Sequence, residues 1–145
     1  MSRPGKWMKI FIDDSGGTAR DLTSQCMDVG DAPLEYDQID VSAYEENKNY
    51  INGQGDSTLT FEFEFSPTAT TGSHTVLSGI VGGNTSRTVT LQYGNGAAAT
   101  GGDPELEGEM ILPSYVVTAA KGEVQKIKAT FKPGPGAALP AWGTV

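Results

Sequence analysis

An all-β, mainly antiparallel fold is predicted by three segments in which apolar and polar residues alternate. In residues 58–65, one leucine and three phenylalanines alternate with two threonines and two glutamates, and residues 87–93 and 123–131 repeat the pattern. A period of two places alternate side chains on opposite faces of a strand, whereas a helix would scatter them around its circumference. Each segment therefore predicts a strand with one face in a core and one in water, for which antiparallel pairing is the default.

Three further strands are expected at residues 6–12, 34–41 and 106–118. Pro113 lies in the last of these and marks a bulge or an edge position, because proline has no N–H to donate within a sheet. Lys121 and Gly122 stand between this segment and the next alternating one. They predict the turn of a hairpin.

One short helix is expected at residues 73–82. Ser73 is the candidate N-cap, and Gly82 with Gly83 ends the helix after about two turns. The apolar residues of this segment share one side of a helix: Val76, Leu77, Ile80 and Val81.

A long polar loop is expected at residues 42–56. It contains Tyr44, Tyr50 and Ile51, which is more apolar material than a free loop needs. Exposed aromatic residues on a long loop often mark a contact surface. The alternative is a loop that folds back onto its own sheet.

Chain length and charge restrict the functions open to this sequence. A chain of 145 residues is expected to form one domain, residues 1–145. Ten Lys and Arg against 18 Asp and Glu give a net charge of −8, so the cationic surface that grips nucleic acid phosphates is missing. Thirteen of the acids fall in residues 13–64, whereas four lysines near the end of the chain face only Glu123. This polarity predicts one acidic and one basic surface, and the alternative is a solvated loop without a role.

No arrangement of side chains points to catalysis. His74 is the only histidine and stands at a predicted helix start, where a structural role is expected. The alternating glutamates of residues 105–109 are typical of a solvated strand face, and the glycine-rich residues 94–102 lack the Lys and Ser/Thr of a phosphate loop. A single cysteine, Cys26, excludes an internal disulfide and a cysteine metal cluster. We therefore expect no catalytic residue, no metal, no cofactor and no enzyme.

No segment has the length of a signal-peptide core or of a membrane span. The expectation is a soluble intracellular product with no membrane partner.

The order of the features resembles a known family. The strand end Asp21-Leu22-Thr23, the run at residues 34–42 and the closing signal Asn49-Tyr50-Ile51-Asn52-Gly53 are similar to the opening of tail tube proteins from long-tailed bacteriophages. The alternating strand that follows, the short helix and the last strand pair continue the match over nearly the whole chain. Related tubes of contractile tails and type VI secretion share the fold.

The resemblance implies a two-sheet β-sandwich or barrel flanked by the short helix. It also implies homohexameric rings that stack into a hollow tail tube, through which double-stranded DNA passes into the host cell without specific binding. The expected partners are further copies of the chain together with tape-measure, tail-terminator and baseplate or tip proteins. The expected location is the virion tail, assembled in the host bacterial cytoplasm.

Two sets of site residues follow from this resemblance. The residues expected at ring-stacking or subunit contacts are Tyr44, Asn49, Tyr50, Ile51, Asn52, Gly53 and Trp142. The residues expected to face an acidic lumen are Thr58, Thr60, Glu62 and Glu64. An acidic wall suits a conduit because it repels phosphates, whereas a cationic wall would hold them.

Two other classes of function stay open from the sequence. A phage decoration or receptor-binding β-sandwich module would be a compact protein that does not polymerise, and it could use Tyr44 and Trp142. A small enzyme would need a convergent set of carboxylates.

Overall fold

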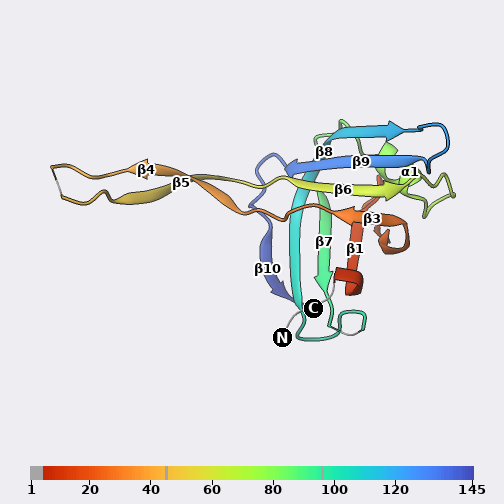
Figure 1. Cartoon of the computed structure of the whole chain (residues 1–145), viewed down its shortest axis with the longest axis horizontal. Helices are drawn as coiled ribbons and strands as arrows, with labels where there is room; N and C mark the ends of the chain where they lie inside the picture. Colours follow the sequence, from red (N-terminus) through yellow and green to blue (C-terminus); the bar gives the residue numbers. More distant parts are fainter. Residues whose placement is uncertain (1–4, 45, 96) are drawn as a thin grey trace.

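The computed structural model describes residues 5–44, 46–95 and 97–145, and most of its regular structure is strand (Figure 1). An eight-stranded antiparallel sheet forms the body, and a separate two-stranded ribbon projects from it. The body strands are β1 Met8–Asp13, β2 Ala19–Asp21, β3 Cys26–Val29, β6 Leu59–Glu64, β7 Arg87–Tyr93, β8 Pro104–Thr118, β9 Lys126–Pro133 and β10 Ala141–Thr144. The ribbon consists of β4 Glu35–Asp40 and β5 Tyr50–Asp56. Among the described residues, no helix is both long and apolar enough to cross a membrane.

The long strand β8 belongs to both layers of the body. Its residues 105–110 pair with β7, which continues to β1 and β2, while its residues 110–118 pair with β9, which continues to β6 and β3. The β8–β9 register shifts between Ile111 and Ser114, around the predicted bulge position Pro113. Such bends let one strand pass between two layers whose strands cross, as β7 and β6 do in Figure 1. The predicted all-β, mainly antiparallel sandwich with one short helix is confirmed, and the described strands do not close into a barrel.

The hydrophobic core lies between these two layers. The inward-facing residues of β6, Leu59, Phe61 and Phe63, are each at most 2% exposed. The Phe61 ring stacks on Phe63 and meets Phe131 of β9 edge to face, with ring centroids 5.7 Å apart in both pairs. The alternation that predicted strand 58–65 therefore arises because one face of β6 is core.

The helix α1, Ser73–Ser78, is shorter than predicted and is capped differently. Gly72 is its N-cap, and a Cβ at Gly72 would lie 2.3 Å from the Ser66 carbonyl oxygen, so a larger residue does not fit there. Ser73 is buried within the first turn, and its hydroxyl donates to the Glu64 carbonyl at 2.6 Å. The predicted cap thus ties the helix to β6. The helix ends early because the Gly82 N–H donates to Leu112 of β8 and not to a helical carbonyl.

The predicted polar loop at residues 42–56 is wrong in its second half, which is strand β5. β5 pairs with β4 in antiparallel register, and only residues 41–49 connect the two strands. Every residue of β4 and nearly every residue of β5 is exposed. The predicted strand at residues 34–41 corresponds to β4, whereas β5 has no buried face to impose apolar alternation and so lacks the pattern by which a strand is recognised.

Besides β5, the strands β2, β3 and β10 were not predicted, and they have three or four residues each. Each lies at a sheet edge or joins the sheet through one partner strand. Alternation is not detectable over so short a length. The predicted hairpin turn between β8 and β9 is confirmed, with Gly122 at φ +84°, a conformation that glycine adopts without strain.

Candidate functional site: the arm, the polar face and the sheet edges

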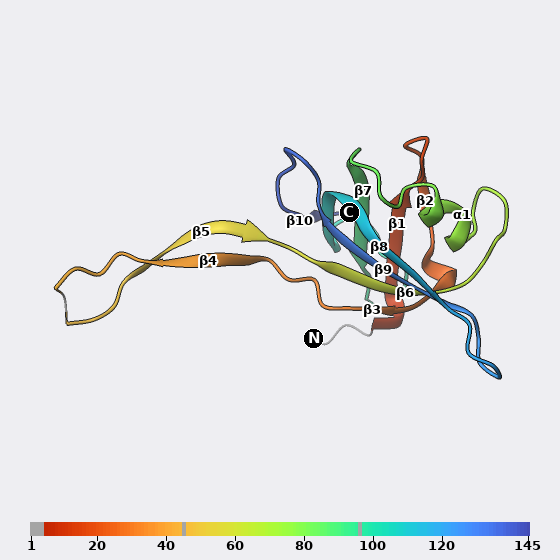
Figure 2. The same ribbon diagram turned by 90° about the horizontal axis from the view of Figure 1, so that it is seen from above.

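The ribbon of β4 and β5, with the residues that connect them, forms an arm (residues 35–56) that extends away from the body (Figure 2). Its six- and seven-residue strands alone span about 20 Å. An isolated two-stranded hairpin is at best marginally stable in water, because it buries neither face. A surface that covers the arm would therefore stabilise it.

The two faces of the arm differ in chemistry. Ile39 lies directly opposite Ile51, and these side chains are 48% and 52% exposed. On the other face, the Gln38 side-chain amide donates to the Asn52 side-chain oxygen at 2.7 Å. The first face leaves two isoleucines half in water, which is typical of a surface that another protein segment covers.

The structure brings most of the predicted contact residues together on the arm. Tyr50, Ile51, Asn52 and Gly53 lie in β5, and Asn49 precedes it. Tyr44 lies in the connection and is fully exposed. The sequence analysis missed Ile39, whose pairing with Ile51 becomes visible only once β4 and β5 are in register.

The root of the arm is fixed to the body. The Lys132 ammonium of β9 donates to the Asp56 carboxylate at 3.1 Å, and the Leu139 side chain lies against Gly55. The Ser57 hydroxyl donates to the Pro33 carbonyl at 2.7 Å. The hydrogen bond from Lys132, followed by that from the Ser57 N–H, lowers the pKa of Asp56 below its usual value. The arm therefore leaves the body in a defined direction even though its faces are open.

The four residues predicted to face a lumen lie along one side of the chain, on or beside the outer face of β6. Thr60, Glu62 and Glu64 alternate with the buried residues of β6, and Thr58 lies just before the strand. Lysines of β9 stand opposite the acids: Lys128 is the cross-strand neighbour of Glu62, and Lys126 that of Glu64. The Lys126 ammonium also lies 3.7 Å from a carboxylate oxygen of Glu62.

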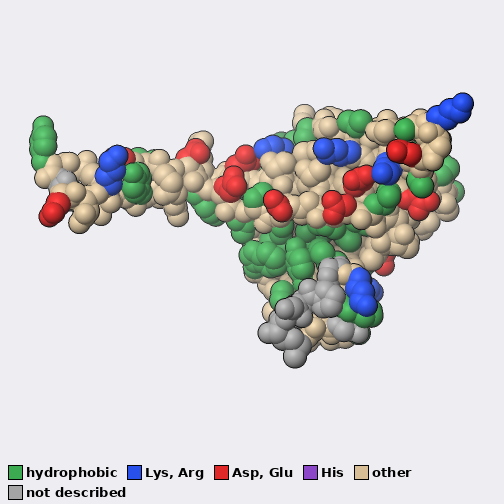
Figure 3. Space-filling model, in the orientation of Figure 1, with side chains coloured by type: hydrophobic (Ala, Val, Ile, Leu, Met, Phe, Trp, Pro, Cys, Tyr) green, Lys and Arg blue, Asp and Glu red, His purple; other side chains and the backbone are tan. Residues whose placement is uncertain are grey.

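This outer face, which we call the polar face, therefore carries both charges. Figure 3 shows acidic and basic side chains side by side along this layer. The face contains a hollow of about 420 Å³ whose lining includes Asp28, Thr60, Thr118 and Lys128. The sequence analysis found the acids by their alternation on one strand, but it did not place the β9 lysines opposite them.

The layer that carries the polar face has two open edges. One is β3, which pairs only with β6 among the described strands, and the other is the end of β8 beyond Leu112, which pairs with β9 alone among the described strands; Leu112 itself forms an isolated bridge with Val81. Open edges present backbone N–H and C=O groups that can pair with another chain. Because the two edges belong to different strands on opposite sides of one layer, they suit a head-to-tail contact.

Trp142, the remaining predicted contact residue, lies apart from the arm in β10. Its strand pairs with β8 of the same chain, and its ring lies against Tyr93 with centroids 5.4 Å apart. The side chain is nevertheless 54% exposed. The tail thus joins its own sheet and still offers an aromatic surface.

The residues weighed for chemistry have structural partners. His74 hydrogen-bonds to the Tyr115 hydroxyl and lies against the Phe65 ring. The Thr88 hydroxyl donates to Glu109 at 2.6 Å, and the Gln92 amide donates to Glu105 at 3.2 Å. In the part of the chain that the structure describes, no group of three His, Cys, Asp or Glu side chains is placed to hold a metal ion.

Cys26 is expected to react slowly with alkylating reagents. Burial raises the pKa of its thiol from an ordinary 9.0 to about 11. Because only the thiolate reacts, alkylation by iodoacetamide at pH 8 should be about a hundredfold slower in the folded chain than in the same chain unfolded in urea. Equal rates, followed by mass spectrometry, would contradict this environment for Cys26.

No protein-family model and no curated protein matches the sequence. Solved structures match over nearly its whole length. A chain of the extended PVC sheath–tube complex, from an extracellular contractile injection system, has a TM-score of 0.69 and 13% identity over 99% of this chain and 93% of that chain.

Two further solved structures also match this chain over nearly its whole length. A chain of the tube-terminating cap of the anti-feeding prophage has a TM-score of 0.69 and 10% identity over 100% of this chain and 93% of that chain. A chain in the tail of an empty gene transfer agent particle, determined with C6 symmetry, has a TM-score of 0.61 and 10% identity over 97% of this chain and 100% of that chain. At such low identity the comparisons concern the fold, and they show that this chain has a tail tube-like fold.

Proposed function

We propose that this chain is a structural tail protein whose copies form hexameric rings, and that the rings stack into a hollow tube that conducts double-stranded DNA into a host cell. The observation that carries the proposal is the end-to-end match to chains of tube, cap and tail assemblies, at coverage of 97% or more of this chain. The C6 symmetry of the gene transfer agent tail supports a ring of six. The proposed location is the virion tail, assembled in the bacterial cytoplasm.

The open edges of the polar-face layer support ring formation. Pairing of β3 in one copy with the end of β8 beyond Leu112 in the next would extend the sheet from copy to copy. Such a contact is heterologous, and six repeats close it into a ring when the rotation between copies is 60°. The polar face would then line one side of the wall throughout the ring.

The arm supports the stacking of rings. It reaches beyond the body and exposes Ile39, Ile51 and Tyr44. A contact made by a projecting arm on a different surface of the next copy generates an open filament, which is the symmetry of a tube. The ends of such a tube would meet tape-measure, tail-terminator and baseplate or tip proteins.

The polar face is the proposed lumen wall. Its glutamates repel phosphates and stand opposite the lysines of β9, so the wall offers no continuous cationic track on which DNA would be retained. The proposed lumen wall therefore carries a row of acids opposite a row of lysines, whereas the sequence predicted an acidic lumen. DNA passes along such a wall without specific binding.

Reversing the two β6 acids should slow DNA release. In a particle that carries Glu62→Lys and Glu64→Lys, each copy loses two negative and gains two positive charges on the proposed wall, and the wall should hold DNA phosphates. We expect release, measured by dye uptake of ejected DNA, to slow by at least tenfold in tubes of normal appearance.

A matched variant separates this effect from lost sheet pairing. Adding Lys126→Glu and Lys128→Glu to the two changes restores opposite charges across β6 and β9 and the original net charge. Release should then return close to the wild-type rate. Unchanged release in the first variant would contradict the assignment of the polar face to the lumen.

Electron microscopy of the purified chain tests the proposed function. Negative staining at rising protein concentration should show six-fold rings or long hollow tubes. Dispersed globules at millimolar concentration would contradict the proposal and favour a decoration or receptor-binding module.

A further inference from the structure

We propose that the turn end of the β8–β9 hairpin is the surface that receives the arm of the next copy. We call residues 116–128 the hairpin end. The proposal rests on the proposed stacking function and adds to it the receiving surface, which neither the fold match nor the arm itself identifies.

The two surfaces carry opposite charge. The arm contains six acids against the single base Lys48, a net charge of −5, whereas the hairpin end contains Lys121, Lys126 and Lys128 against Glu123, a net charge of +2. Lys126 and Lys128 face Glu62 and Glu64 of β6, so Lys121 at the turn is the cation that the arm would meet first. Complementary charge steers one surface to the other and disfavours wrong pairings. An arm that met another arm would bring two such acidic segments together, which costs free energy.

Both surfaces also expose apolar side chains. Contact between the surfaces would cover the apolar side chains of both. Val116, Val117 and Val124 of the hairpin end are 49%, 44% and 52% exposed. The Ile39–Ile51 face of the arm is exposed to the same degree. Val116 and Val117 lie on opposite faces of the hairpin, so an arm that covers one of these faces removes that valine and the Ile39–Ile51 face from water, which stabilises an arm that is marginal on its own.

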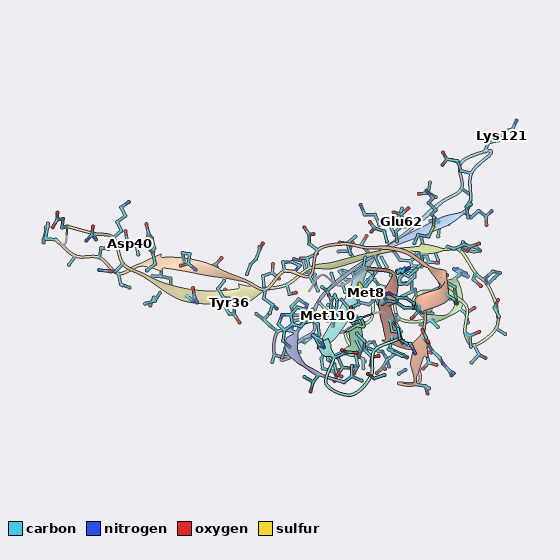
Figure 4. The ribbon with its side chains drawn as sticks, turned by 60° about the horizontal axis from the view of Figure 1, so that its bottom comes forward. Met8, Tyr36, Asp40, Glu62, Met110 and Lys121 are labelled. Atoms are coloured by element: carbon cyan, nitrogen blue, oxygen red, sulfur yellow. The ribbon has the colours of Figure 1, made fainter. Side chains whose placement is uncertain are left out.

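The positions of the two surfaces suit stacking. Asp40 on the arm and Lys121 at the hairpin turn lie at opposite ends of the molecule (Figure 4). The arm therefore cannot fold onto the hairpin end of its own chain. A copy displaced along the long axis brings its hairpin end toward the arm of its neighbour, and repetition of this contact builds an open filament.

Cross-linking between two kinds of chain tests the contact directly. In a Cys26→Ala background, one chain carries Asp37→Cys, on the same face of β4 as Ile39, and a size-tagged second chain carries Lys121→Cys. The chains are mixed, assembled and treated with a bis-maleimide. We expect the mixed dimer as the main product in the tube fraction, with dimers of one chain type in the minority.

The outcomes separate this proposal from the function on which it rests. Tubes without the mixed dimer, or with only Asp37→Cys dimers, overturn the hairpin end as the receiving surface and leave the tube function standing. If the Cys26→Ala chain forms neither tubes nor rings although it is folded, both proposals fall.

Charge reversal gives a second, independent readout. Asp37→Lys alone and Lys121→Glu alone should each raise the protein concentration needed for tube assembly by about fivefold, and the double variant should return it toward the wild-type value. Glu107→Lys, at an exposed position on the outer face of β8 away from the hairpin end, is the control and should leave this concentration unchanged. Additive losses in the double variant would overturn the pairing of arm and hairpin end.

Discussion

Replacing Phe61 with alanine is expected to lower the free energy of unfolding by about 4 kcal/mol. Phe61 is 1% exposed at the centre of the core, and its ring contacts both Phe63 and Phe131. The variant loses the burial of an aromatic ring and leaves a cavity between two layers that are joined through β8 and cannot close freely. A loss of this size is a large part of the 5–15 kcal/mol that stabilises a typical domain.

Urea denaturation followed by circular dichroism measures this loss. The control is Val116→Ala, at a β8 position that is 49% exposed, and it should change the free energy of unfolding by no more than about 0.5 kcal/mol. A loss below 1 kcal/mol for Phe61→Ala would mean that the two layers do not pack as described.

The same residues explain which parts of the fold could be predicted. Strands β6, β7 and β9 were found because each has one face in the core, and burial on one face imposes alternation on the sequence. The β8–β9 turn was found because Gly122 adopts a positive φ that favours glycine. At these positions, burial of one strand face or the backbone conformation of a turn restricts which residue types are found.

The parts that were missed depend on partners that the local sequence does not contain. Ser73 looks like a cap, yet its hydroxyl is used by Glu64, a residue on another element. β5 resembles a loop because it is solvated in a single copy. If the arm is covered in an assembly, as we propose, the pattern of its sequence reflects a surface on another molecule.

The candidate site likewise contains residues that could be recognised from the sequence and residues that could not. The arm residues Tyr50 and Ile51 drew notice because apolar side chains are unusual in a polar stretch, and the structure places both on the exposed ribbon. The lysines opposite Glu62 and Glu64 could not be recognised in the same way, because these cross-strand neighbours are separated by more than 60 positions in the chain. The charge balance of the polar face is therefore a property of the fold.

Deletion of residues 45–49 is expected to yield a folded chain that no longer forms tubes. The deletion shortens the connection between β4 and β5 and leaves the body strands and the Asp56–Lys132 contact at the root intact. The melting temperature should change little because none of the described arm residues belongs to the core cluster. Electron microscopy and analytical ultracentrifugation should show monomers or single rings, and normal tubes would contradict the role of the arm.

A paired substitution separates arm length from arm chemistry. Ile39→Ser with Ile51→Ser removes the apolar face without changing the length, and half-covering two isoleucines contributes about 2.5 kcal/mol to a contact, so the concentration needed for assembly should rise roughly a hundredfold. Gln38→Ser with Asn52→Ser alters the opposite face of the ribbon and should have a much smaller effect. Equal losses of assembly from both pairs would mean that neighbouring chains enclose the arm on both faces. A loss of assembly confined to the isoleucine pair assigns the contact to one face.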